Sequence, residues 1–200
     1  VALKIEWAFR QRGAEGEVAA ARFARETGLP YIGLCRGMQQ MVIEFARNVM
    51  GWDDATSTEF DPESRHPVIS LLEEQKGIEN LGGTMRLGHY PCKLRPESKA
   101  RAAFGQDQVD ERHRHRWEFN NNYKVELEEA GLIAVGTSPD GSLVEICELR
   151  NHPFMVGSQF HPELRSRPGR PHPLFAAFMA AVIAHAGSQT DVATEPVRQP

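Results

Sequence analysis

The pattern of apolar and polar positions changes abruptly near residue 35. Residues 29–35 form a short apolar run of the kind found in strands that are buried on both faces. The residues that follow place apolar side chains on one face of a helix, which Gly51 closes. These apolar positions are Met38, Met41, Val42, Phe45, Ala46, Val49 and Met50. The pattern therefore predicts a sharp turn from strand to helix at Cys35.

The rest of the chain alternates helical and strand-like segments around one irregular stretch, residues 51–112. The expected helices are residues 15–27, 123–130 and 174–186, and the expected strands are residues 132–136, 143–149 and 154–160. Ser138-Pro139-Asp140-Gly141 predicts a tight hairpin between the first two of these strands. We expect one α/β domain over residues 1–187 and a disordered polar tail over residues 188–200.

Composition narrows the class of protein. The chain has 200 residues, 40% apolar and 25% charged, which is typical of one compact globular domain. No apolar run approaches the roughly 20 residues of a membrane span, and the first residues lack a secretory signal. Cys35, Cys92 and Cys147 are widely spaced, so we expect neither disulfides nor a metal site, and a cytoplasmic location. The net charge of −4 argues against a nucleic-acid partner.

Gly33-Leu34-Cys35-Arg36-Gly37 has the spacing of a nucleophile elbow. Such a turn holds its central side chain in a strained conformation above the sheet, and the flanking glycines leave room for the turn. Backbone N–H groups at the start of the helix can stabilise a thiolate and a developing oxyanion. A buried structural cysteine before an ordinary helix explains the pattern equally well.

A thiol nucleophile needs a base and a group that orients the base. His161-Pro162-Glu163 supplies both residue types at the end of an expected strand, where active-site groups of open α/β sheets gather. The carboxylate could hold the imidazole in its productive tautomer. Taken alone, His-x-Glu recurs by chance and favours a surface histidine beside a solvated glutamate.

Together these motifs resemble the triad-type, or class I, glutamine amidotransferases, and more specifically the amidotransferase domains of the CTP synthase family. The resemblance covers roughly residues 12–186. Its segments are Arg12-Gly13-Ala14-Glu15-Gly16, Gly37-Met38-Gln39, Ile43-Glu44-Phe45-Ala46-Arg47, Ser57-Thr58-Glu59-Phe60-Asp61-Pro62, Gly82-Gly83-Thr84-Met85-Arg86-Leu87-Gly88, Glu111-Arg112-His113-Arg114-His115-Arg116, Val144-Glu145-Ile146, Gln159-Phe160-His161-Pro162-Glu163 and His172-Pro173-Leu174-Phe175. The glycine-rich and histidine-rich segments are the most specific, because other triad amidotransferases lack them.

The resemblance implies roles for single residues. Cys35 is the implied nucleophile, His161 the base and acid, and Glu163 its orienting partner. The implied glutamine-binding residues are Ala8, Arg36, Gly37, Met38, Gln39, Glu59 and Arg116. Glu59 and Arg116 would hold the α-amino and α-carboxylate groups of glutamine, and the planar fork of arginine suits a carboxylate.

The resemblance also implies a fold and partners. The fold is a flavodoxin-like, doubly wound α/β domain with a mostly parallel sheet, and the chain starts after the place of its opening strands. The implied reaction is hydrolysis of L-glutamine, with the ammonia used in the ATP-dependent amination of UTP to CTP. ATP, UTP and magnesium would bind a synthetase domain or chain, so no cofactor is expected in this chain. A membrane partner is not expected.

Two local departures from the family pattern leave alternatives open. Residues 6–10, from Glu6 to Arg10, stand where the family has a Pro-Gly-Gly-Phe-Gly loop that supplies an oxyanion-hole N–H. Ala8 and Arg10 resist the positive φ that glycine tolerates. Arg36 stands where the family usually has leucine and needs solvent or a carboxylate. Residues 6–10 and the missing opening strands favour a catalytically silent binding or assembly module, whereas the triad, Glu59 and Arg116 favour the enzyme. An independent cysteine hydrolase is a third hypothesis.

Overall fold

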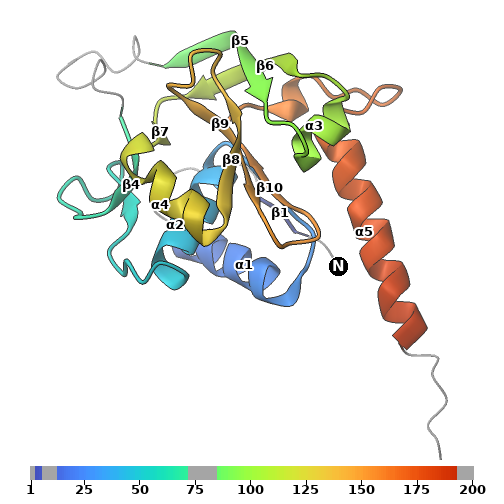
Figure 1. Ribbon diagram of the computed structural model, residues 1–200, viewed down its shortest axis with the longest axis horizontal. Coiled ribbons are helices and arrows are strands. Elements are labelled where there is room, and N and C mark those ends of the chain that lie inside the picture. Colours follow the sequence, from blue (N-terminus) through green and yellow to red (C-terminus); the bar gives the residue numbers. More distant parts are fainter. Residues whose placement is uncertain (1–2, 6–12, 72–84, 193–200) are drawn as a thin grey trace, which may run out of the picture.

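The computed structural model describes residues 3–5, 13–71 and 85–192 (Figure 1). The helices are α1 (Ala14–Thr27), α2 (Arg36–Asn48), α3 (Lys99–Phe104), α4 (Lys124–Ala130) and α5 (Pro173–Val192), with short 3-10 helices η3 (Asn121–Tyr123) and η4 (Pro162–Leu164). The strands are β1 (Leu3–Ile5), β2 (Tyr31–Leu34), β3 (Thr56–Ser57), β4 (Pro67–Ser70), β5 (Arg86–Leu94), β6 (Gln108–His115), β7 (Glu118–Phe119), β8 (Leu132–Thr137), β9 (Val144–Leu149) and β10 (Met155–Ser158).

The main sheet has seven strands in the order β1-β2-β10-β9-β8-β5-β6. Only β1, β2 and β10 run parallel to one another, and the other neighbouring pairs are antiparallel. The prediction of a mostly parallel sheet was therefore wrong, although the α/β class is confirmed. The reason lies in the connections: residues 138–143 and 150–154 are too short for a parallel crossover, which needs about a dozen residues.

Strand β1 forms the parallel edge of the sheet. β1 pairs with β2 in register, with Leu3 opposite Tyr31 and Ile5 opposite Gly33. One strand therefore precedes β2 on this side of the sheet, and β2 itself lies between β1 and β10. This internal position explains why β2 is buried along its whole length.

Helices cover the two faces of the sheet with separate apolar clusters (Figure 1). One cluster joins α1, α2 and α4 to one face, and the other joins α3 and α5 to the opposite face. Strand β2 contributes side chains to both clusters: Tyr31 belongs to the first, and Ile32 and Leu34 belong to the second. This alternation follows from the two-residue period of a strand. The apolar run at residues 29–35 therefore marks a strand buried on both faces.

The element boundaries differ from the sequence prediction mainly in two regions. Helix α5 runs to Val192, beyond the expected end at residue 186, and so includes the first part of the stretch predicted as disordered. Residues 51–112, which showed no regular pattern, contain β3, β4, β5 and the start of β6, and β7 follows them to complete the small sheet β3-β4-β7. Within the described ranges, no helix combines the length and apolar character that crossing a membrane requires.

Candidate active site

Cys35 lies at the turn from β2 into α2, as the pattern predicted. Its backbone has φ 53° and ψ −104°, a region that side-chain-bearing residues rarely adopt. Its N–H donates to the carbonyl of Ser158 at 2.7 Å, which ties the turn to the end of β10. The thiol makes no capping hydrogen bond to α2, although Cys35 is the N-cap residue. The side chain is therefore held at the helix start without being used for capping.

Glycine at position 33 makes this turn sterically possible. A Cβ atom there would lie 2.6 Å from the carbonyl carbon and oxygen of Gly37, a distance that rigid backbone cannot accommodate. Gly157 on β10 has the same role, because a Cβ atom would lie 2.9 Å from the side chain of Met38. Two glycines on neighbouring strands therefore let α2 approach the sheet closely and set the height of Cys35 above it.

His161 and Glu163 lie where β10 ends, and their side chains are in contact. Nδ1 of His161 lies 2.5 Å from Oε1 of Glu163, so the carboxylate holds that nitrogen protonated. The backbone N–H of His161 donates to the carbonyl of Arg112 at 2.8 Å, which fixes the histidine against β6. The imidazole is thereby oriented from two sides.

The electrostatics of His161 link it to Cys35. Burial lowers the pKa of His161, but interactions with Cys35 and Glu163 outweigh it and raise the pKa to about 10. Nε2 is buried and makes no hydrogen bond of ordinary geometry within the described part of the chain. The interaction with Cys35, first as a hydrogen-bond partner and then through charge, therefore contributes to the raised pKa of His161, and the remaining nitrogen of His161 is available to a reacting group.

Glu59 and Arg116, which lie far apart in the sequence, come together electrostatically. Burial raises the pKa of Glu59, and the positive charges of Arg36 and Arg116 oppose that rise. Glu59 follows the short strand β3, and its N–H donates to the hydroxyl of Ser57 at 3.2 Å. A carboxylate and a guanidinium are thus close enough to influence each other, as recognition of a zwitterion requires.

Arg36 forms an ion pair with the carboxylate of Glu17. Nε of Arg36 lies 3.0 Å from Oε2 of Glu17 on α1, and both side chains are largely buried. The guanidinium also lies over the ring of Phe60, 5.1 Å from its centre. This pair joins α1 and the loop after β3 to the start of α2. The charge of Arg36, which stands where the family usually has leucine, is therefore balanced by the carboxylate of Glu17.

The other predicted glutamine-binding residues differ in what they can offer. Met38 is fully buried under Gly157, and the carbonyl of Gly37 accepts a hydrogen bond from Tyr31 at 2.8 Å. The side chain of Gln39 is directed inward, where Nε2 donates to the carbonyl of Trp117 at 3.0 Å. These three residues therefore offer a ligand their backbone more than their side chains. Ala8 and the rest of residues 6–12 lie outside the described residues.

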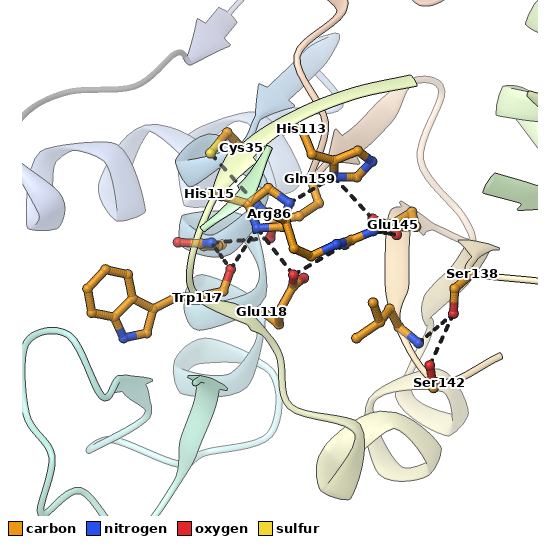
Figure 2. Close-up of polar contacts among 12 residues, drawn as sticks. Cys35, Arg86, His113, His115, Trp117, Glu118, Ser138, Ser142, Glu145 and Gln159 are labelled. Carbon is orange, nitrogen blue, oxygen red and sulfur yellow. Dashed lines mark hydrogen bonds and ion pairs between the residues drawn. The ribbon is translucent and has the colours of Figure 1, made fainter. Parts of the chain in front are cut away.

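Sequence reasoning missed a buried polar cluster behind the nucleophile (Figure 2). Arg86 on β5 lies 3.2 Å from Glu118 and 2.8 Å from Glu145 on β9. His113 and His115 of β6 complete the cluster, which reaches Cys35 through the glutamine at 159. The motif Gln159-Phe160-His161-Pro162-Glu163 contained the signal for Gln159, but only its histidine and glutamate were assigned roles.

A strained cysteine at a strand-to-helix turn thus lies beside a histidine–glutamate pair at the end of the next parallel strand. The sequence matches the family described as "Glutamine amidotransferase class-I" over residues 8–181, so the chain belongs to that family. Within it, the chain closely matches the glutaminase domain of CTP synthase. The family predicted from the motifs is thereby confirmed.

Individual relatives show how far the match extends. The chain is 62% identical over 175 residues to a CTP synthase of Rubrobacter xylanophilus, which covers 88% of this chain and 32% of that relative. It is 59% identical over 177 residues to a CTP synthase of Dehalococcoides mccartyi, with the same coverage. A solved structure of the glutaminase domain of Trypanosoma brucei CTPS with bound acivicin has a TM-score of 0.86 at 37% identity, covering 90% of this chain and 70% of that one. The chain spans about a third of the length of the curated relatives that it matches.

Proposed function

We propose that this domain hydrolyses the side-chain amide of L-glutamine through a thioester on Cys35. The observation that carries the proposal is the arrangement of Cys35, His161 and Glu163, with one nitrogen of His161 fixed by the carboxylate and the other left for a reacting group. The raised pKa of His161, about 10, supports a charged imidazole beside Cys35. That pairing of nucleophile and base is what cysteine-based acyl transfer uses.

The steps follow from this pairing. The thiolate attacks the amide carbon, a carbon–sulfur bond forms, and the carbonyl electron pair moves to the oxygen. Collapse of this intermediate breaks the carbon–nitrogen bond, and His161 gives its proton to the departing nitrogen, which leaves as ammonia. His161 then takes a proton from water, which attacks the thioester and releases glutamate and the thiolate. Backbone N–H groups at the start of α2 stabilise the oxyanion in both steps.

Recognition of glutamine rests in this proposal on Glu59 and Arg116. The carboxylate attracts the α-ammonium group, and the guanidinium binds the α-carboxylate through two parallel hydrogen bonds. The influence of Arg116 on the pKa of Glu59 supports the assignment, and so does the half-buried position of Arg116. The backbone of residues 36–39 faces the reacting end of the substrate, and Ala8 would supply the second oxyanion donor.

The ammonia, in this proposal, serves the ATP-dependent amination of UTP to CTP. The similarity to CTP synthases supports this, and so does the glutaminase domain of the Trypanosoma brucei protein. ATP, UTP and magnesium would bind a synthetase region, in the same chain or a partner, in the cytoplasm. No cofactor would bind the amidotransferase domain itself. The rival hypothesis, a silent domain used only for binding or assembly, rests on the sequence of residues 6–10.

Labelling with a glutamine-mimicking diazoketone distinguishes these two functions. We expect one adduct per chain, located on Cys35 by peptide mass spectrometry and suppressed by excess glutamine. Cys35→Ala is the matched control and should take up no label, because Cys92 and Cys147 are fully buried and burial raises their pKa. A folded protein that reacts with iodoacetamide at Cys35 but not with the diazoketone would identify the silent module.

A further inference from the structure

Gln159 places a carboxamide directly behind the nucleophile (Figure 2). Its side-chain Nε2 lies 3.7 Å from Sγ of Cys35, within the range of N–H···S hydrogen bonds. The residue is completely buried, and its backbone N–H donates to the carbonyl of Glu145 at 2.8 Å. The side-chain amide therefore cannot form hydrogen bonds with water. Whether its nitrogen or its oxygen faces Cys35 decides whether the thiol meets a donor or an acceptor.

A chain of hydrogen bonds fixes that direction. The carbonyl of Trp117 can only accept, so the atom of Gln39 that lies 3.0 Å away must be the amide nitrogen. The same nitrogen lies 3.1 Å from Gln159, so the atom of Gln159 on that side must be its oxygen. The amide nitrogen of Gln159 is left facing Cys35. The donor toward the sulfur is thus determined by a backbone carbonyl two links away.

The buried cluster behind Gln159 holds the anchoring carbonyl in place. Nδ1 of His115 lies 3.2 Å from the carbonyl of Trp117, so this nitrogen carries the proton. Its Nε2 then accepts from Nδ1 of His113 at 2.8 Å. Burial and the positive charge of Arg86 lower the pKa of His113 to about 3, so the pair stays neutral at physiological pH. The direction of each hydrogen bond in this series, from donor to acceptor, therefore does not change near neutral pH.

We propose that Gln159 is a further catalytic residue of the amide hydrolysis proposed above, donating a hydrogen bond to the thiolate of Cys35. Gln39 and His115 are positioning residues that keep the donor turned toward the sulfur. The thiolate occurs twice in the reaction, as the attacking group and as the group released from the thioester. A donor aimed at the sulfur favours the charged form at both points, because hydrogen bonding to a charged form stabilises it. This role deepens the proposed function and rests on it.

The pH dependence of iodoacetamide labelling tests the proposal without requiring glutamine to bind. Gln159→Met removes the donor with little change in size. We expect the midpoint of the labelling profile to rise by about one pH unit, the effect of one hydrogen bond to a charged group, and labelling at pH 6 to slow about tenfold. The other titratable and charged groups of the site, His161, Glu163, Glu59, Arg36 with Glu17, and Arg116, are unchanged in this variant.

Gln40→Met is the matched control, because Gln40 is a buried glutamine on the same helix as Gln39 and its amide nitrogen has no hydrogen-bond partner within the described residues. Its profile should coincide with that of the wild type. Equal profiles for Gln159→Met and Gln40→Met overturn the proposal. If Gln159→Met does not fold, Gln39→Met is the test, because this change lets the amide of Gln159 rotate. An unchanged midpoint of the labelling profile in Gln39→Met also overturns the proposal. Loss of diazoketone labelling in the wild type, with an intact iodoacetamide profile, contradicts glutamine hydrolysis instead.

Discussion

The backbone conformation of Cys35 lowers the stability of the fold but places the thiol where the proposed reaction needs it. With φ 53°, the residue occupies a region where a Cβ atom is strained, and such strain costs about 1–3 kcal/mol. The cost is carried because the turn lifts the thiol to the start of α2, where the N–H of Cys35 is held by Ser158 at 2.7 Å. The nucleophile therefore sits in a conformation that a residue without a side chain would adopt more readily.

Replacement of the nucleophile tests this strain directly. We expect Cys35→Gly to be more stable than Cys35→Ala by about 1 kcal/mol, because glycine accepts a positive φ that alanine resists. Both variants lose the thiol, so the comparison isolates the backbone. The free energy of unfolding in urea measures the difference. Equal stabilities, or a more stable alanine variant, would show that the turn is relaxed.

Individual side chains explain what the sequence could and could not reveal about the site. Cys35 and His161 were predictable because each follows a short apolar strand, and strand ends gather at one edge of a sheet. The ion pair between Arg36 and Glu17 was not, because it joins two helices and has no sequence period. The direction of the Gln159 amide depends on a carbonyl contributed by Trp117, which only the folded chain brings near.

At the scale of elements, the approach of α2 to the sheet decides where the nucleophile stands. We expect Gly33→Ala to lower the free energy of unfolding by about 2 kcal/mol, since its Cβ atom would meet the backbone of Gly37 at 2.6 Å. The same clash should lift the start of α2 and slow diazoketone labelling of Cys35. Urea unfolding and labelling rates, measured on the same preparation, check both effects.

The helix α1 supplies the matched control for that variant. A Cβ atom at Gly16 would meet no atom within 4 Å. We therefore expect Gly16→Ala to raise the free energy of unfolding by about 0.5–1 kcal/mol, because alanine favours a helix more than glycine does. A Gly33→Ala variant as stable as Gly16→Ala would contradict the close approach of α2 to β2.

Strand β6 shows why part of the fold escaped prediction. Its residues alternate strictly between exposed and buried, but the buried positions include Glu111, His113 and His115. An apolar pattern cannot reveal a strand whose inner face is polar, so residues 51–112 were interpreted as irregular. The antiparallel order, by contrast, was within reach, because the connections at 138–143 and 150–154 are too short for parallel crossovers. Buried polar groups and connection length therefore account for the two main errors.

At the scale of the whole molecule, the buried cluster makes stability depend on pH. The folded-state pKa of His113 is depressed from 6.5 to about 3 by burial and by the positive charge of Arg86. A depressed pKa gives stability that is present above the unfolded value and is lost as the pH falls toward 3. Glu118 acts with the opposite sign, because burial raises its pKa to about 8 and its contribution is lost as the pH rises. The two effects partly cancel, so the effect of His113 must be measured as a difference between variants.

Between pH 7 and pH 5, we expect the free energy of unfolding of His113→Gln to fall by about 2 kcal/mol less than that of the wild type. In this range the histidine of the unfolded wild type binds a proton, whereas His113 of the folded protein does not. The free energy of unfolding at several pH values gives both slopes, and the lower absolute stability of the variant does not affect them. His89→Gln, at an exposed position of β5, should keep the wild-type slope. Parallel slopes for all three proteins would mean that His113 gains a proton in the folded state as readily as in the unfolded one, and that the anchor behind Gln159 carries a charge.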